Sequence, residues 1–495
     1  MIGKTASFLI ASLIAAPILV ILSSWRTPMD DVFLHLMSTG LSEVLFNTLW
    51  LVMGVAVGTT VLGVSLAWLT ATLEFPGRAI FNWALVLPLA IPTYVLAFVN
   101  IALALPGIRS TGGIIFVMTM ALYPYVYLLA RNGFLTSGKR ATEVAQSLGQ
   151  TPISAFFKVA LPMAQPMILS GLMLALMETL ADFGAVSIFN YDTFTTTLYK
   201  AWFSMFSLNA AAKFSSFLVV LAFLLLWLEQ RARQSKRYIP AEKQPRSAMR
   251  VPLNGAPRFL ASAYCFTILF VAFIVPVMYL SIGAFTVLSE DLDSRYFGFL
   301  GRSLGLSAMA ALLVVAGALL MSYTHRYHKI AFLVRLATVG YALPGTILAV
   351  VGIMITTSTG FLTGTLFAMM LGYLTRFMAV AHNPIESGMA RITPHIDEAA
   401  RSLGAGGLRM ITKVQMPLLR EGLIVGAILV FVDVMKEMPI TLMTRPFGWD
   451  TLAVRIFEFT AEGDWERATL PAITLVLTGL LPVILLTRRL ERCPS

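Results

Sequence analysis

Two stretches of this sequence repeat each other: residues 143–162 read EVAQSLGQTPISAFFKVALP, and residues 398–417 read EAARSLGAGGLRMITKVQMP. In both stretches a glycine follows the first glutamate by six residues, and a proline follows that glycine by thirteen. The copies lie 255 residues apart, and the same spacing relates pairs of acids in the apolar stretches that follow. The sequence therefore predicts an internal duplication that covers at least a loop and the next helix.

The composition is that of an integral membrane protein. Of the 495 residues, 58% are hydrophobic and only 12% are charged, and the mean hydropathy is +0.80. Soluble domains carry about twice that share of charge, so a soluble enzyme is excluded. A helix that crosses a bilayer needs about 20 apolar residues. Stretches of that kind predict an all-α fold with twelve crossings, near residues 6–25, 44–70, 79–105, 112–130, 162–186, 214–228, 259–286, 303–323, 333–354, 358–375, 418–444 and 468–487.

The twelve predicted crossings divide into two halves of six. We expect a first half at 1–230, a basic cytoplasmic linker at 231–258 and a second half at 259–495. Because six is an even number, both halves enter the membrane from the same side, and the two repeated loops lie on the same face. This is a parallel duplication. Both parallel and inverted repeats occur among transporters, so the duplication alone does not decide the class of protein.

The charges predict the orientation in the membrane. The chain has 36 Lys and Arg against 25 Asp and Glu, a net charge of +11. With the N-terminus in the cytoplasm, ten of the 36 basic residues lie outside and the other 26 inside, as the positive-inside rule requires. Both termini and both repeated loops are then cytoplasmic. Since orientation accounts for the charge, no nucleic-acid partner is expected.

Each repeated loop is too short to span the bilayer and predicts a surface element. In the first copy a short helix begins at Glu143, Gly149 ends it, and Pro162 starts the next crossing. The second copy, from Glu398 to Pro417, has the same pattern. One such element could simply lay the chain along the membrane. Two copies with matched spacing on one face favour a surface that meets a two-fold partner.

This pattern resembles the EAA loop of binding-protein-dependent ABC importer permeases. The first copy departs from the motif only by Val144 in place of the central alanine. The resemblance implies a type I importer fold with two fused permease halves in the bacterial inner membrane. It also implies that each loop docks on an ATP-binding subunit, and that an external solute-binding protein delivers the solute. The residues that carry the motif are Glu143, Ala145, Gly149, Pro162, Glu398, Ala399, Ala400, Gly404 and Pro417.

Further segments resemble the ferric-iron branch of these permeases. In the first half they are ETLADFG at 178–184 and DTFTT at 192–196. In the second half they are DVMKEMP at 433–439, RPF at 445–447 and DTLA at 450–453. The resemblance implies that ferric iron is the transported solute. Fused thiamine and aminoethylphosphonate permeases share the architecture, so these solutes remain alternatives.

Four acids lie within predicted membrane helices and are candidates for the translocation pathway: Glu178, Asp182, Asp433 and Glu437. Intramembrane carboxylates are costly and usually line a bundle interior or an aqueous cavity, and oxygen ligands suit a hard ion such as Fe(III). Alternatively, the acids pair with Lys436 or cap helix ends. A secondary transporter that moves protons over the same acids is a rival interpretation. The sequence alone does not identify a metal ligand.

The energy for transport is expected to come from partner subunits. Gly3-Lys4-Thr5 resembles the end of a P-loop but is not preceded by the glycine that the motif requires. We therefore expect a chain that is not an enzyme and holds no cofactor, with ATP and Mg²⁺ bound by two ATPase subunits. Helix contacts are expected at three glycine pairs with G-x-x-x-G spacing: Gly54/Gly58, Gly301/Gly305 and Gly422/Gly426.

Overall fold

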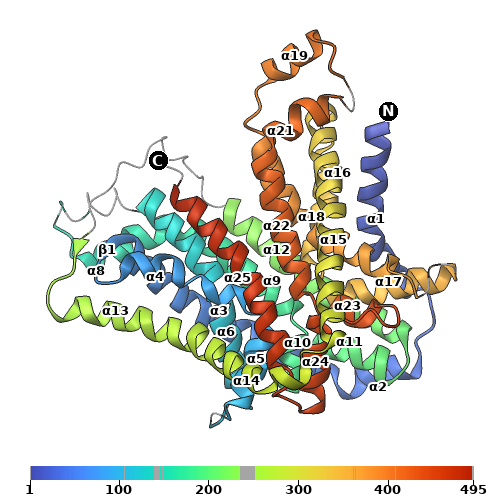
Figure 1. Cartoon of the computed structure of the whole chain (residues 1–495), viewed down its shortest axis with the longest axis horizontal. Coiled ribbons are helices and arrows are strands. Elements are labelled where there is room, and N and C mark those ends of the chain that lie inside the picture. Colours follow the sequence, from blue (N-terminus) through green and yellow to red (C-terminus); the bar gives the residue numbers. More distant parts are fainter. Residues whose placement is uncertain are drawn as a thin grey trace. The chain divides into compact units, whose positions relative to one another are not determined.

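The computed structural model describes residues 2–104, 106–138, 145, 147, 149–234, 251–360, 362, 364–406 and 409–492. Helices dominate this part of the chain (Figure 1), and its strands are β1 (Leu73–Glu74) and β2 (Val251–Pro252), which pair in parallel. The predicted all-α membrane fold is confirmed. Glu143 and most of the predicted linker lie outside the described residues. Contacts divide the chain into two units, which we name the α3 unit and the α15 unit.

The α3 unit comprises residues 41–196, 220–288 and 459–495. Its centre is formed by α3, α6 and α9, which pack on one another. Glycines allow this approach, since a Cβ atom on Gly58 would lie 2.5 Å from the Thr119 hydroxyl. The helices are α3 (Leu41–Thr72), α4 (Arg78–Ala84), η1 (Leu87–Ala90), α5 (Thr93–Ala102), α6 (Thr111–Gly133), η2 (Phe134–Gly138), α8 (Pro152–Ala155), η3 (Phe156–Ala160), α9 (Leu161–Ala181), α10 (Gly184–Ile188), α13 (Ala256–Leu269), η5 (Phe270–Ile274), α14 (Val275–Asp291) and α25 (Thr469–Arg492).

The α15 unit comprises residues 1–40, 197–219 and 289–458. Its centre is formed by α15, α18 and α22, the counterparts of α3, α6 and α9. The helices are α1 (Ile2–Ser24), α2 (Asp31–Thr39), η4 (Lys200–Ser204), α15 (Ser294–His328), α16 (Ala331–Thr338), η6 (Val339–Ala342), α17 (Gly345–Thr359), α18 (Phe367–Met389), α19 (Pro394–Ser402), η7 (Met410–Gln415), α21 (Met416–Leu418), α22 (Arg420–Lys436) and α23 (Pro439–Thr444). Among the described helices, α14 ends three residues beyond the α3 unit, and three more continue from one unit into the other: α11 (Phe194–Tyr199), α12 (Leu208–Gln234) and α24 (Leu452–Glu462).

Each unit contains helices from both halves of the sequence. In the α15 unit, α1 packs on α15, α16, α17 and α18. In the α3 unit, the hydroxyl of Tyr264 in α13 lies 2.8 Å from that of Ser65 in α3, and Gly283 of α14 packs on Thr469 of α25. The contact units therefore differ from the consecutive halves. The boundaries at residues 230 and 259 stay a prediction about the sequence repeat.

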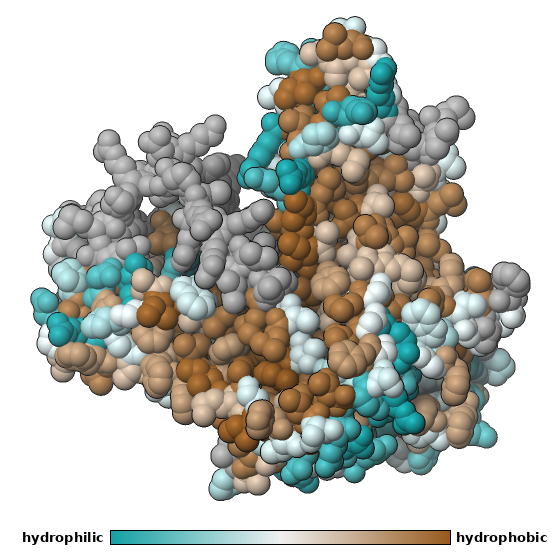
Figure 2. All heavy atoms as spheres, viewed as in Figure 1, coloured by the Kyte–Doolittle hydropathy of each residue, from teal (hydrophilic) through white to brown (hydrophobic). Residues whose placement is uncertain are grey.

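The described part of the chain has seven helices that are long and apolar enough to cross a bilayer, or up to nine if each of two bent pairs is one span. The remaining predicted crossings coincide with α18, α22 and α25, of which α22 has only 17 residues. Figure 2 shows an apolar surface along α15 and α22, with hydrophilic atoms at the end of this unit that carries α19. Such a distribution fits helices that cross a membrane and expose one end to water.

Two crossings that the sequence predicts as single helices are broken. Residues 78–90 and 93–102 meet at 90°, and residues 331–342 and 345–358 meet at 110°. Pro92 and Pro344 cause these breaks, because proline restricts the preceding residue to extended backbone and cannot donate a helical hydrogen bond. Both prolines are the N-cap of the second helix of their pair.

Several other predicted helix limits are wrong; for example, the tenth crossing ends at Met389 rather than 375, and the eighth begins at Ser294 rather than 303. The fifth crossing ends at Ala181 rather than 186, and the eleventh ends at Lys436 rather than 444. The tenth begins at Phe367 rather than 358. Of the turn predicted at 356–360, residues 356–359 continue α17, and Gly360 ends that helix with a φ of +67°. The differences at the ends of the fifth and eleventh crossings have one cause: an acid immediately after each helix bonds to the next turn of backbone, as described below.

The segment after α1 is anchored on the first turns of α12. Lys213 is fully buried, and its Nζ donates hydrogen bonds to the carbonyls of Thr27 at 3.2 Å and Pro28 at 2.7 Å. The same ammonium lies 5.5 Å from the centre of the Phe33 ring. A buried charge is tolerated only with such partners. Lys213 thus fixes the path of the chain between α1 and α2.

Candidate functional site

The two EAA loops end their first helix with the same turn. The amide of Gln150 donates to the carbonyl of Ala145 at 3.0 Å, and the amide of Ala405 donates to that of Ala400 at 2.9 Å. Between them, Gly149 and Gly404 have φ of +87° and +78°, a region that glycine adopts without strain. This six-to-one bond with a left-handed glycine is a Schellman motif. The predicted helix-ending role of both glycines is confirmed.

The loops also share the turn that leads into the following crossing. The amide of Leu161 bonds to the carbonyl of Phe156, and the amide of Met416 bonds to that of Ile411, so both copies contain a π-helical turn. Pro162 and Pro417 follow immediately and occupy the first turns of α9 and α21. The repeat found in the sequence therefore reproduces the same backbone hydrogen bonds in both units, even though the side chains differ.

The second loop presents a mixed apolar and acidic surface. Within α19, Ala400 is buried, whereas the Glu398 side chain is 69% exposed and its contact with Nδ1 of His395, at 3.5 Å, is exposed as well. Leu403 is 86% exposed and Ile396 is 38% exposed. Large apolar side chains with this exposure on a water-facing turn are typical of a contact surface for another protein. Ala399 is also exposed.

Asp182 and Glu437 are buried at equivalent positions and each caps a short helix. One oxygen of Asp182 accepts hydrogen bonds from the amides of Ala185 at 2.9 Å and Val186 at 3.2 Å. Glu437 accepts from the amides of Ile440, at 3.0 and 3.1 Å, and Thr441, at 3.3 Å. The carboxylates therefore satisfy the free amides at the start of α10 and α23. This is the helix-capping alternative that the sequence leaves open.

Each capping acid also meets the second helix of a broken pair. The hydroxyl of Thr93, the first residue of α5, donates to Asp182 at 2.5 Å. Gly345, the first residue of α17, leaves the space that Glu437 occupies, since a Cβ atom there would lie 2.5 Å from the carboxylate. Helix N-termini carry partial positive charge. In each unit, then, one carboxylate joins the N-termini of two short helices.

The other two candidate acids differ from the capping pair. Glu178 lies in α9, one turn before Asp182, and Asp433 lies at the corresponding place in α22. Both are half-buried rather than buried. The structure therefore brings each predicted pair together on one helix end but gives its members different surroundings. Of the four acids, Glu178 and Asp433 are the two that stay partly exposed.

Replacing Asp182 should separate its capping role from its charge. Asp182→Ala leaves two buried amides without an acceptor, so we expect the free energy of unfolding to fall by about 1–3 kcal/mol. Asp182→Asn keeps a carbonyl oxygen for the same amides and should lose less than half as much. Thermal unfolding of the purified protein in detergent measures both. Equal losses for the two variants would show that the amide bonds to Asp182 do not stabilise the fold.

The Asp-Thr pairs after the capping helices are held in parallel ways. The side chain of Asn47, at the start of α3, donates to the carbonyl of Asp192 at 3.1 Å. Arg302 stands 255 residues later in α15, and its Nε donates to the carbonyl of Asp450, also at 3.1 Å. The first helix of each central trio thus fixes the segment that follows the buried acid. Sequence reasoning missed both contacts, although the 255-residue spacing relates the two donors.

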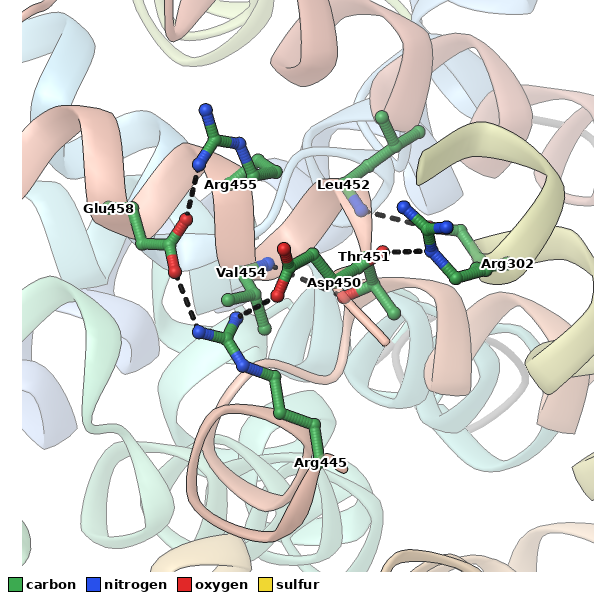
Figure 3. A network of polar contacts seen from close by, with 9 residues as sticks. Arg302, Arg445, Asp450, Thr451, Leu452, Val454, Arg455 and Glu458 are labelled. Atoms are coloured by element: carbon green, nitrogen blue, oxygen red, sulfur yellow. Dashed lines mark hydrogen bonds and ion pairs between the residues drawn. The ribbon is translucent and has the colours of Figure 1, made fainter. Parts of the chain in front are cut away.

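The second half adds a charged network at this place (Figure 3). Arg445 pairs with Asp450 at 3.1 Å and with Glu458 at 2.7 Å, and Arg455 pairs with Glu458 at 2.7 Å. Their side chains are about one quarter exposed, so solvent weakens each pair, and the network acts mainly by fixing geometry. When Asp192-Thr193 is aligned with Asp450-Thr451, Lys200 in the first half corresponds to Glu458 in the second. The two halves therefore differ in charge here.

A comparison with known families decides the class of protein. Residues 59–233 match the family described as "Binding-protein-dependent transport system inner membrane component". This part of the chain is therefore similar to permeases of this type. The matched region runs from α3 to α12 and includes the first EAA loop, so the family resemblance inferred from that loop is confirmed.

Similar proteins agree with the duplicated architecture. The permease is 28% identical over 458 residues, 90% of both chains, to the Fe(3+)-transport system permease protein FbpB 2 of Haemophilus influenzae. It is 28% identical over 233 residues to the molybdate/tungstate transport system permease protein WtpB of Pyrococcus abyssi, which covers 46% of this chain and 94% of the relative. A putative 2-aminoethylphosphonate permease, PhnV of Salmonella typhimurium, is 33% identical over 143 residues, 28% of this chain and 52% of the relative. One part of this permease thus matches nearly the whole of a shorter relative.

Proposed function

We propose that this permease is the fused membrane subunit of an ATP-driven importer. Two ATPase subunits dock on the two EAA loops, and an external solute-binding protein delivers the solute. The observation that carries the proposal is the repeated loop, with the same Schellman turn and the same π-helical turn in both copies. A pair of loops with the same backbone turns suits a partner with two-fold symmetry, such as an ATPase dimer. The exposed Leu403 and Glu398 supply an apolar and an acidic contact.

The proposed location is the bacterial inner membrane, with both termini and both EAA loops in the cytoplasm. The excess of basic residues on that side supports this orientation. ATP and Mg²⁺ are bound by the partner subunits, and the permease binds no cofactor. Closure of the ATPase dimer moves the loops, and the loops move the crossings that follow them. The rigid-body motion opens a central pathway alternately to each side.

We propose ferric iron as the solute. The relative that aligns along 90% of both chains is named as an Fe(3+)-transport permease, and partly exposed carboxylates in the membrane give hard oxygen contacts for a hard cation. Glu178 and Asp433 would meet the ion in passage, while Asp182 and Glu437 hold the surrounding short helices in place. Glu178→Gln should therefore lower Fe(III) uptake more than Asp182→Asn does.

Uptake by cells that lack the gene tests the solute. Labelled Fe(III), molybdate, thiamine and 2-aminoethylphosphonate are supplied separately to the deletion strain and to the same strain carrying the gene on a plasmid. We expect the deletion to lower Fe(III) uptake selectively, with recovery from the plasmid. A loss confined to another of these solutes would overturn the iron assignment while leaving the importer assignment intact.

A further inference from the structure

The second EAA loop is attached to the cytoplasmic end of α15 by directional polar contacts. Arg326, in the last turn of α15, pairs through Nε with Asp397 at 2.7 Å. Its two terminal nitrogens donate to the carbonyls of Met389 at 3.0 Å and Ile392 at 2.8 Å. Asp397 is buried and lies in the first turn of α19. One guanidinium therefore holds both the entry to the loop and the start of its helix.

The next residue of α15 holds the far side of the same loop. The hydroxyl of Tyr327 accepts a hydrogen bond from the side chain of Gln415 at 2.8 Å, at the end of η7. The guanidinium of Arg401, in the last turn of α19, lies 5.1 Å from the centre of the Tyr327 ring. Gln415 is fully buried. Together Arg326 and Tyr327 grip the loop before, within and after α19, and we call these contacts the α15 clamp.

The first half of the sequence cannot form this clamp. With the 255-residue spacing, the residues at the places of Arg326, Tyr327, Asp397, Arg401 and Gln415 are Ala71, Thr72, Thr142, Gln146 and Ala160. None of these five carries a charge, and Thr72 uses its hydroxyl on the carbonyl of Trp68 in its own helix at 2.7 Å. An ion pair between α3 and the first loop at these places is therefore impossible.

Aromatic rings occupy the corresponding region of the α3 unit. Trp68 of α3 packs on Phe134, which precedes the first loop, with 5.3 Å between ring centres. It also packs on Phe156, in the π-helical turn after that loop, at 4.7 Å. Ring contacts of this kind tolerate sliding and rotation, whereas charge-assisted hydrogen bonds fix distance and direction. In the described residues, Trp68 thus joins α3 to the segments on both sides of the first loop by ring contacts, whereas Arg326 holds the second loop by charge-assisted hydrogen bonds.

We propose that the α15 clamp makes the second EAA loop and α15 move as one body. Arg326 and Tyr327 are then positioning residues that convert movement of the loop into movement of the membrane helices. This inference rests on the proposed function, because it assumes that α19 receives its movement from an ATPase subunit. The clamp then determines how much solute is moved per ATP hydrolysed, whereas docking of the ATPase subunit does not depend on it.

The test uses the permease reconstituted in proteoliposomes with its two ATPase subunits and its binding protein loaded with Fe(III). ATP hydrolysis and uptake are measured on the same preparation. We expect Arg326→Ala and Asp397→Asn to lower uptake per ATP about threefold or more while the ATPase subunits still co-purify. The double variant Arg326→Asp/Asp397→Arg restores an ion pair. Its uptake per ATP should be higher than that of either single variant, Arg326→Asp or Asp397→Arg. Arg335→Ala, which removes an exposed charge from α16, is the control and should leave the ratio unchanged.

A milder variant keeps the test decisive if changes at Arg326 prevent insertion. Tyr327→Phe removes the acceptor for Gln415 and the hydrogen bond of the same hydroxyl to Asp397, while the Arg326 contacts stay. We expect it to lower uptake per ATP by about twofold. Unchanged uptake per ATP in Arg326→Ala, or in Tyr327→Phe when Arg326→Ala does not insert, would overturn the clamp while ATPase binding still supported the importer. Failure of the unaltered permease to bind any ATPase subunit would instead contradict the proposed function.

Discussion

Replacing Glu398 with arginine is expected to weaken binding of the ATPase subunit about tenfold or more and to abolish most uptake. The side chain is 69% exposed, and its contact with His395 is exposed as well, so its loss costs the fold little. The reversed charge would face whatever basic group the partner offers, and like charges across an interface cost several kcal/mol. Co-purification of the tagged permease with the ATPase subunit measures the effect. Glu143→Arg tests the first loop in the same way.

Glu290→Arg provides the matched control, since it makes the same charge reversal at an exposed acid near the end of α14. We expect this variant to bind the ATPase subunit as the unaltered permease does. All three variants should reach the membrane in equal amounts. If Glu398→Arg binds and transports like the Glu290 control, the EAA loop is not the docking surface.

The largest loss of stability is expected from Gly171→Leu. A Cβ atom on Gly171 would lie 2.7 Å from the carbonyl oxygen of Tyr125 and 2.8 Å from the Cα atom of Val126. Both are backbone atoms of α6, so a side chain cannot be accommodated by a rotamer change, and α9 must separate from α6. Overpacking usually costs about 1–3 kcal/mol, and a backbone clash falls at or above the upper end. We expect little folded permease in the membrane fraction.

Gly301→Leu makes the same change where a Cβ atom would meet no described atom within 4 Å. This control should leave the amount of folded permease and its unfolding temperature nearly unchanged. Fluorescence-detected size-exclusion chromatography of both variants measures the folded fraction. A folded fraction for Gly171→Leu equal to that of the control would show that the close approach of α6 and α9 is not required.

The sequence predicts the helices and the loop turns because local properties determine them. Hydropathy locates most crossings, and the position of Gly149 and Gly404 six residues after a glutamate indicates where each loop helix ends. Hydropathy misplaces the ends of α9 and α22 because Asp182 and Glu437 accept hydrogen bonds from backbone amides that come later in the chain. Hydropathy averages over such a single polar residue within an apolar stretch.

Contacts between distant segments are the part that the sequence does not predict. Close packing at Gly54/Gly58 and Gly422/Gly426 is confirmed, but a Cβ atom added at Gly301 or Gly305 would meet no described atom within 4 Å. The spacing is the same in all three pairs, so tertiary packing decides which pair is used. The packing of α1 on α15 and the α15 clamp are tertiary in the same sense. The charged Arg326 at the end of an apolar helix is the one local sign of the clamp.

The energy source of uptake tests the central claim most directly. Proteoliposomes containing the permease, both ATPase subunits and the Fe(III)-loaded binding protein are assayed with and without ATP, and with and without a protonophore. We predict uptake that requires ATP and the binding protein and persists when the proton gradient is removed. Uptake that collapses with the proton gradient and survives without ATP would contradict the importer and show a proton-coupled transporter instead.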